Sequence, residues 1–185
     1  HQISMEKIIF HMTNNNIDNM FFDSPEKALR NQLKMPYVSL IQSGMNFGYG
    51  GGNNIGIKYA INNGADYVMI LNNDTVLDPN FLEPLVQICE NDKNIGIASG
   101  KIYFFDRPDI IWFNGGKYHP NKVLVDHINY NEKDIGQLPP EEISFISGCM
   151  WLIPKNIFDT VGYINEEYFM YIEDLEFCCR VINEG

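Results

Sequence analysis

Hydrophobic and polar positions along the first hundred residues predict strands that alternate with helices. Short apolar runs bounded by polar residues predict strands at 7–12, 37–41, 67–71 and 94–105. Apolar residues at helical spacing predict intervening helices at 25–34, at 55–63 ended by Gly64, and after Asp78-Pro79. This alternation favours right-handed crossovers and a mostly parallel sheet flanked by helices, which is an α/β fold.

The pattern changes in the second half of the chain. Residues 104–142 predict an irregular region with one or two strands. A strand at 143–153, a short helix at 154–161 ended by Gly162 and an amphipathic helix at 173–184 follow. The helix after Asp78-Pro79 carries apolar residues on one face, namely Phe81, Leu82, Leu85, Ile88 and Cys89. Since 185 residues suffice for one sizeable core, we expect a single domain over residues 1–185.

The strand predicted at 67–71 ends in Asn72, Asn73 and Asp74. In a parallel sheet, ligands bind beyond the carboxyl ends of the strands, which is where these side chains fall. An ionised Asp in apolar surroundings needs a cation or a set of hydrogen-bond donors. A simple Asn- and Asp-rich turn is the alternative, and it is weaker because Asp78-Pro79 already supplies a helix cap.

A glycine-rich stretch, NFGYGGGNN at 46–54, is the second candidate site. It matches neither G-x-G-x-x-G nor G-x-x-x-x-G-K-[ST], which argues against a dinucleotide fold and an ATPase-type phosphate loop. Its glycines would let the backbone approach a ligand closely, and Asn53-Asn54 would open a helix whose N-terminus favours anions. A surface turn is an equally good interpretation.

The third candidate lies at the start of the last predicted helix. Glu173 and Asp174 fall in its first turn, where the helix dipole favours negative charge, so at least one should stay ionised and could accept a proton. Ordinary compensation of the dipole is the alternative. The preceding aromatic residues, Tyr168, Phe169 and Tyr171, suit stacking on a sugar ring.

Composition excludes several classes of partner. With 24 acidic and 13 basic residues, the chain has a formal net charge of -11, which disfavours nucleic acid and anionic lipid. No stretch approaches the length of a membrane span, and no signal peptide opens the sequence. The four cysteines show no metal-site or disulfide spacing, so we expect reduced thiols in a cytoplasmic protein.

Four segments in order resemble the conserved blocks of family-two glycosyltransferases with the GT-A fold, in particular rhamnosyltransferase-like members. They are NFGYGGGNNIG (46–56), LNNDT (71–75), GCMWLI (148–153) and FMYIEDLEFCCR (169–180), and the resemblance runs from about residue 38 to the end. It implies a Rossmann-related sheet with a smaller irregular acceptor-side region. Residues 1–103 would bind the nucleotide sugar, and residues 104–185 would form the acceptor and catalytic part.

The resemblance also implies roles for individual residues. Asp74, beside Asn72 and Asn73, would hold Mg²⁺ or Mn²⁺ against the diphosphate of the donor. Asp174, with Glu173 beside it, would deprotonate the acceptor hydroxyl. Arg180 would lie near the diphosphate or pair within the fold, and we favour pairing. Further predicted substrate-binding residues are Asn46, Gly48, Asn53, Asn54, Trp151 and Tyr171.

The sequence departs from the family pattern near its beginning. The opening strand signature of the family has no counterpart, so the domain is expected to be N-terminally incomplete. The segment 7–18 aligns instead with the second strand, where Thr13 replaces the Asp that usually contacts the nucleobase. Glu176 likewise replaces an Asp in the last helix.

The predicted function is inverting, divalent-metal-dependent sugar transfer from a nucleotide-diphosphate sugar to a glycan or lipid-linked acceptor. This would serve cell-surface polysaccharide synthesis, with at most peripheral association at the inner face of the membrane. The alternative is a non-catalytic domain of the same fold that binds nucleotide or carbohydrate. A nucleotidyltransferase is a more distant third.

Overall fold

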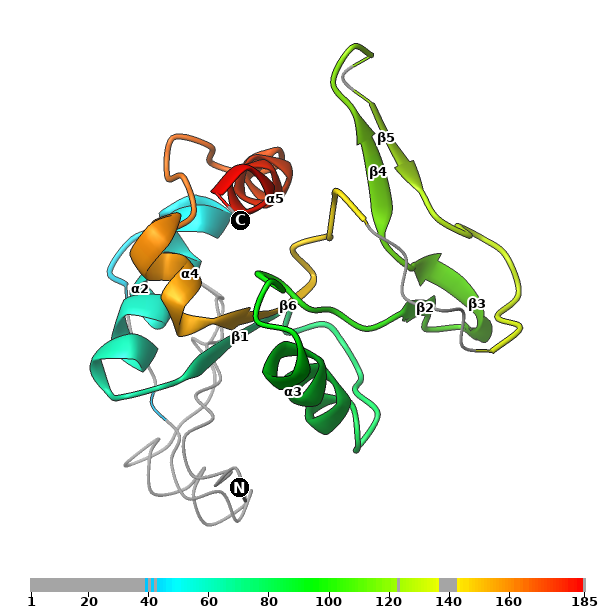
Figure 1. Cartoon of the computed structure of the whole chain (residues 1–185), viewed down its shortest axis with the longest axis horizontal. Helices are drawn as coiled ribbons and strands as arrows, with labels where there is room; N and C mark the ends of the chain where they lie inside the picture. Colours follow the sequence, from blue (N-terminus) through cyan, green and yellow to red (C-terminus); the bar gives the residue numbers. More distant parts are fainter. Residues whose placement is uncertain (1–38, 40, 42, 123, 137–142, 185) are drawn as a thin grey trace.

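The computed structural model describes residues 39, 41, 43–122, 124–136 and 143–184. Its elements are, in chain order, α2 (Gly48–Asn62), β1 (Tyr67–Leu71), α3 (Leu82–Asn91), β2 (Ile102–Phe104), β3 (Arg107–Phe113), β4 (Gly116–His119), β5 (Leu124–His127), β6 (Met150–Pro154), α4 (Lys155–Thr160) and α5 (Glu173–Glu184) (Figure 1). The predicted strand at 7–12, the predicted helix at 25–34 and most of the predicted strand at 37–41 lie outside the described residues.

Strands β1 and β6 form the central sheet and pair antiparallel, with Tyr67 opposite Pro154 and Leu71 opposite Met150. Side chains alternate across this sheet as the pleat requires. Val68 of β1 and Trp151 of β6 belong to the core shared with α2, α4 and α5. Residues on the opposite face, including Met69 and Leu152, belong to the core shared with α3. The result is three layers, with β1 and β6 between helices (Figure 1).

The core beneath α5 is aromatic. Trp151 and Phe177 are both fully buried, and their rings stack with centroids 5.4 Å apart. Phe158 of α4 also stacks on Phe177, with ring centroids 6.3 Å apart. Burying aromatic side chains of this size contributes about 1.5–3 kcal/mol each, so these contacts fix α5 against the central sheet.

The helix α3 differs from its prediction in two ways. It begins at Leu82, whereas Asp78 forms a separate turn in which its carboxylate accepts the Asn80 N–H at 2.8 Å. Ile88, predicted to face the core, is 45% exposed, and Val86 is buried instead. Val86 belongs with Leu82, Leu85 and Cys89 to one i, i+3, i+4, i+7 face, whereas Ile88 lies beside that face.

The region between β2 and β5 contains more strands than predicted. β2 pairs with β3 and β4 with β5, both antiparallel, and the β4–β5 ribbon projects away from the central sheet (Figure 1). Rings of Phe113, His127 and Phe145 pack together at its base, with Phe113 edge-on to the other two. The Lys101 ammonium, just before β2, connects to the chain after β5, since it donates to Asp134 at 2.8 Å and to the Gly136 carbonyl at 2.6 Å.

The prediction of a mostly parallel sheet is not seen in the described part of the chain, where every strand pair is antiparallel. The predicted partners of β1 at 7–12 and 37–41 lie largely outside that part. The long strand predicted at 94–105 is also wrong. Only Ala98 bridges to Leu152 there, and β2 then turns away to pair with β3.

Two expectations about the chain as a whole can be compared with the structure. All four cysteines are free thiols, as predicted. Among the described residues, no helix combines the length and the apolar character that crossing a membrane would require.

Candidate active site

The glycine-rich stretch forms the first turns of α2, which begins at Gly48. Here the prediction of a loop with a helix opening at Asn53-Asn54 is wrong, because both asparagines lie inside the helix. The carboxamide oxygen of Asn46 accepts the Gly48 N–H at 2.9 Å and so satisfies a donor at the start of the helix.

The glycines allow α2 to approach the chain that leads into α5. Gly48 has φ +73°, and a Cβ there would overlap the Phe169 carbonyl oxygen and lie 2.9 Å from the carbonyl carbon. At Gly50 a Cβ would lie 3.0 Å from the Asn165 carbonyl oxygen. The Tyr49 N–H donates to the Phe169 carbonyl at 2.9 Å. The close approach that these glycines permit is therefore to the protein's own backbone.

Asn53 and Asn54 are occupied by contacts within the protein. The Asn53 amide donates to the Tyr49 carbonyl at 2.9 Å. Asn54 is 1% exposed, its amide donates to Ile164 and Glu166, and its oxygen accepts the Ile164 N–H. With donor and acceptor both engaged, the Asn54 carboxamide has a structural role, and its place beside a ligand stays a prediction.

All four predicted segments meet at Gly148 and Cys149, which open the third segment just before β6. The Tyr49 hydroxyl, from α2, donates to the Gly148 carbonyl. The Gly148 N–H donates to Oδ2 of Asp174 at 3.3 Å, and the Asn72 N–H, after β1, donates to the Cys149 carbonyl at 2.9 Å. A Cβ at Gly148 would lie 2.7 Å from the Tyr49 hydroxyl, so a larger residue here would require the Tyr49 side chain to shift.

The two acids at the start of α5 have different environments. Asp174 is partly exposed, and its second oxygen, Oδ1, accepts the Leu175 N–H at 2.8 Å. Each carboxylate oxygen keeps a further lone pair for another donor. Glu173 is 5% exposed, and its Oε2 has no hydrogen-bond partner. Burial raises the pKa of Glu173, and the charge of Asp174 raises it further, against a lowering by its own backbone N–H.

Tyr49 was not predicted as a site residue. Burial raises the pKa of its phenol, and the nearby charges of Asp174 and Glu173 raise it further, so the hydroxyl stays protonated and donates to Gly148. The sequence marks Tyr49 only as a tyrosine among the glycines of the segment 46–56. It does not show which distant carbonyl group the hydroxyl would reach.

Asp74 is exposed, and its charge acts on Cys149 of the Gly148–Cys149 segment. Burial raises the pKa of the Cys149 thiol to about 11, and the charge of Asp74 contributes to that rise. The turn holding Asp74 is closed by the Thr75 hydroxyl, which donates to the Asn72 carbonyl at 2.8 Å. The carboxylates of Asp74 and Asp174 thus both approach the same two-residue segment.

The donor set around Asp74 suits a hard cation that shares its coordination with a substrate. Among the described residues, no three His, Cys, Asp or Glu side chains lie together in a way that could hold a metal ion with protein ligands alone. Mg²⁺ and Mn²⁺ accept one or two carboxylates together with water and phosphate oxygens. One exposed carboxylate, with the exposed Asn73 carboxamide next to it, fits that pattern.

The remaining predicted residues divide between structural and exposed positions. Trp151 is fully buried, and its indole N–H donates to the Ile146 carbonyl at 3.0 Å, so these contacts place it in the core and its binding of substrate stays a prediction. Arg180 pairs with Glu176 through two hydrogen bonds of 2.6 and 2.9 Å, which confirms pairing within the fold. Tyr171 is 76% exposed and therefore accessible to a ligand. Thr13 lies outside the described residues.

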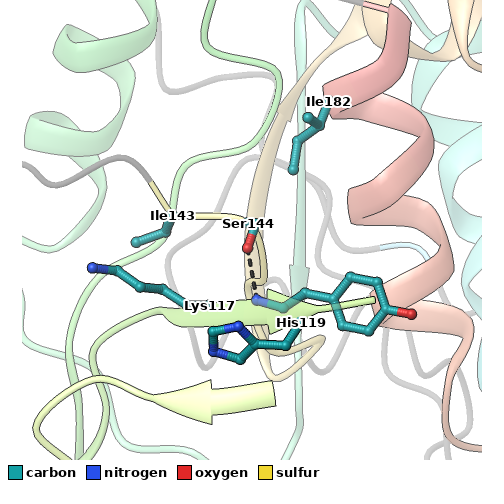
Figure 2. A pocket seen from close by; sticks show the side chains of 6 residues that line it. Lys117, His119, Ile143, Ser144 and Ile182 are labelled. Atoms are coloured by element: carbon teal, nitrogen blue, oxygen red, sulfur yellow. Dashed lines mark hydrogen bonds between the residues drawn. The ribbon is translucent and has the colours of Figure 1, made fainter. Parts of the chain in front are cut away.

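A pocket of about 360 Å³ lies between β4 and the last turn of α5 (Figure 2). It is lined by Lys117, Tyr118, His119, Ile143, Ser144 and Ile182. The Ser144 hydroxyl oxygen accepts the Tyr118 N–H at 2.7 Å, drawn as a dashed line in Figure 2. Because a helix rises about 1.5 Å per residue, Ile182 is well separated from the acids that begin α5. None of the predicted site residues lines this pocket.

Residues 23–162 match the family model described as Glycosyl transferase family 2. The chain belongs to this family. Membership implies the GT-A fold, and family members typically use a divalent metal. The predicted family is confirmed, and the match includes the segments at 46–56, 71–75 and 148–153, whereas the segment at 169–180 lies beyond it.

Two named relatives cover most of the chain. The low-salt glycan biosynthesis hexosyltransferase Agl10 of Haloferax volcanii is 30% identical over 169 residues, which are 88% of this chain and 52% of the relative. The dTDP-rhamnosyl transferase RfbF of Shigella flexneri is 32% identical over 154 residues, 80% of this chain and 47% of the relative. The chain thus spans about half the length of the curated relatives it matches.

Proposed function

We propose that this domain transfers a sugar, with inversion, from a nucleotide-diphosphate sugar to a glycan or lipid-linked acceptor in cell-surface polysaccharide synthesis. The observation that carries this proposal is the meeting of α2, the end of β1 and Asp174 at Gly148 and Cys149. These contacts support the proposal because they join the end of β1, which leads to Asp74, and the Asp174 carboxylate to one segment, as group transfer from a diphosphate would need.

Electrostatics supports a requirement for a cation. The carboxylates of Asp74 and Asp174 both act on the Gly148–Cys149 segment. A diphosphate bound beside these two carboxylates would be repelled unless its charge were offset. In the proposal Asp74 holds Mg²⁺ or Mn²⁺, with Asn46, Asn72 and Asn73 at the edge of the donor site. When bound, the metal offsets the charge that develops on the leaving diphosphate.

Asp174 is the proposed general base. Its carboxylate takes the proton of the acceptor hydroxyl while the hydroxyl oxygen forms a bond to the anomeric carbon. The bond from that carbon to the diphosphate oxygen breaks, and its electron pair leaves with the nucleoside diphosphate. Attack opposite the leaving group inverts the anomeric configuration. The backbone hydrogen bonds to both oxygens of Asp174 fix the orientation of the base.

The acceptor would pass over the exposed aromatic side chains that precede Asp174. Phe169 and Tyr171 are 57% and 76% exposed, and the apolar faces of sugar rings stack on such side chains. The named relatives support a hexose or deoxyhexose as the transferred sugar, since one is called a hexosyltransferase and the other a dTDP-rhamnosyl transferase. We therefore include dTDP-rhamnose among the first donors to test.

The test is a transfer assay on a panel of nucleotide sugars with Mn²⁺, using the chain and its Asp174→Asn variant. The variant should bind the donor as the wild type does, yet turn over about 10²–10⁴-fold more slowly. Asp159→Asn, which removes an exposed carboxylate on α4, is the matched control and should keep full activity. Thermal stabilisation by nucleotide sugars without transfer to any acceptor would instead identify a non-catalytic binding domain.

A further inference from the structure

Glu173 is the unusual member of the acid pair. Among the buried side-chain oxygen and nitrogen atoms of the described residues, Oε2 of Glu173 alone lacks a hydrogen-bond partner. Buried polar atoms are nearly always satisfied, so such an atom calls for a physical explanation. Its neighbour Asp174 is partly exposed and accepts two backbone N–H groups. Two adjacent carboxyl groups thus have opposite environments.

The groups around Glu173 give a carboxylate no compensating charge. Tyr49 of α2 and Asp174 of α5 both interact with it electrostatically. The other titratable groups that act on Tyr49 are two thiols, Cys149 before β6 and Cys178 of α5. Burial raises the pKa of both thiols. An ionised Glu173 would therefore place a second negative charge in a buried position beside the Asp174 carboxylate, whereas the neutral acid avoids the cost of that charge.

We propose that Glu173 is a positioning residue that enters the reaction as a neutral carboxylic acid and leaves Asp174 as the single charged base of the pair. The role in catalysis rests on the proposed function, whereas the protonation state stands on burial and contacts alone. A neutral Glu173 acts through Asp174, because a second negative charge beside the base would repel the diphosphate.

The first experiment compares pH–rate profiles of the wild type and Glu173→Gln. Glutamine is close in shape to a neutral glutamic acid and cannot ionise. Glu173→Gln should therefore keep kcat/KM within about threefold of the wild type at pH 7, in contrast to the loss in Asp174→Asn. The activity of the wild type should fall at high pH as Glu173 ionises, and the variant should lack that fall. Glu167→Gln, at an exposed position nearby, controls for loss of one negative charge and should keep the profile of the wild type.

The second experiment needs no activity and follows stability against pH. The pKa of Glu173 is raised in the folded state, so the neutral side chain contributes stability below about pH 4, its ordinary value in the unfolded chain. That contribution is lost as pH rises through the folded value. The Tm of Glu173→Gln minus that of the wild type should therefore increase with pH above about 4, whereas the same difference for Glu167→Gln should stay flat.

The outcomes separate this proposal from the proposed function. If the wild type transfers no sugar but the Tm difference rises with pH, the proposed function fails and the neutral state of Glu173 stands. If Glu173→Gln loses as much activity as Asp174→Asn and the Tm difference stays flat, Glu173 is ionised and the proposal is overturned. Should Glu173→Gln fail to fold, the infrared band of a protonated carboxyl group in the wild type at pH 7 decides, and its absence refutes the neutral state.

Discussion

Gly48 lies directly against the carbonyl group of Phe169, and a Cβ at Gly48 would be 2.9 Å from the carbonyl carbon. The next residue, Tyr49, donates its N–H to the same carbonyl at 2.9 Å. The start of α2 and the chain that enters α5 are therefore held together by backbone contacts that no side chain could replace. This contact sets the distance between the glycine-rich segment and the acid pair.

Gly48→Ala should destabilise the domain strongly. The substitution combines an unfavourable φ of +73° with an overlap against rigid backbone, and we expect a loss of about 3 kcal/mol or more in the free energy of unfolding. Gly44→Ala is the matched control, because Gly44 has φ +78° and nothing within 4 Å of its Cβ position. The control should lose only about 1–2 kcal/mol. Urea unfolding of both variants measures the difference, and equal losses would show that contact with Phe169 is unimportant.

Trp151→Phe should reduce stability without changing ligand binding. The variant loses the indole N–H that donates to the Ile146 carbonyl and part of the stack on Phe177. We expect a cost of about 1–3 kcal/mol in chemical denaturation, with Trp112→Phe, at a partly buried position, as a milder control. The rise in Tm on adding Mn²⁺ and a nucleoside diphosphate should stay unchanged. If Trp151→Phe kept normal stability but lost the rise in Tm caused by Mn²⁺ and the nucleoside diphosphate, Trp151 would belong to the substrate site.

Asp134 should make the stability of the domain depend on pH in the acid range. The hydrogen bonds from Lys101 and Tyr103, with one from the Gly136 N–H, lower the pKa of Asp134 to about 2. A lowered folded pKa contributes stability that is complete above the unfolded value of about 4 and is lost as pH falls to about 2. In Asp134→Asn this part of the acid destabilisation should disappear. Parallel curves of Tm against pH for the two proteins would contradict the assignment.

The sequence was sufficient to predict the elements whose signal is local. The helix at 173–184, the strand at 67–71 and the helix stop at Gly64 follow from periodicity and from the freedom of glycine to adopt φ +83°. Placing Glu173 and Asp174 in the first turn of α5 was therefore possible from the sequence. The pairing of Arg180 with Glu176 follows from the same helical spacing, because residues i and i+4 share one face.

Contacts between distant segments could not be predicted in this way. The glycine-rich segment has poor helix propensity, and tertiary packing against residues 164–169 makes it helical nonetheless. Trp151 lies in a matching segment, but strand alternation alone does not say which face of the sheet meets α5. The Tyr49–Gly148 hydrogen bond joins residues far apart in the chain, so no local pattern could identify it.

The central claim is that Asp74 holds a metal–diphosphate group beside Asp174, and Tm measurements test it most directly. For the wild type, Mn²⁺ with UDP or dTDP at about 100 times Kd should stabilise the fold by about 2.7 kcal/mol and raise its Tm, beyond the effect of either component alone. Asp66→Asn, at the opposite end of β1, is the control and should show the same rise. We predict that Asp74→Asn folds normally and loses the metal-dependent part of the rise. An undiminished rise in Asp74→Asn would contradict the account.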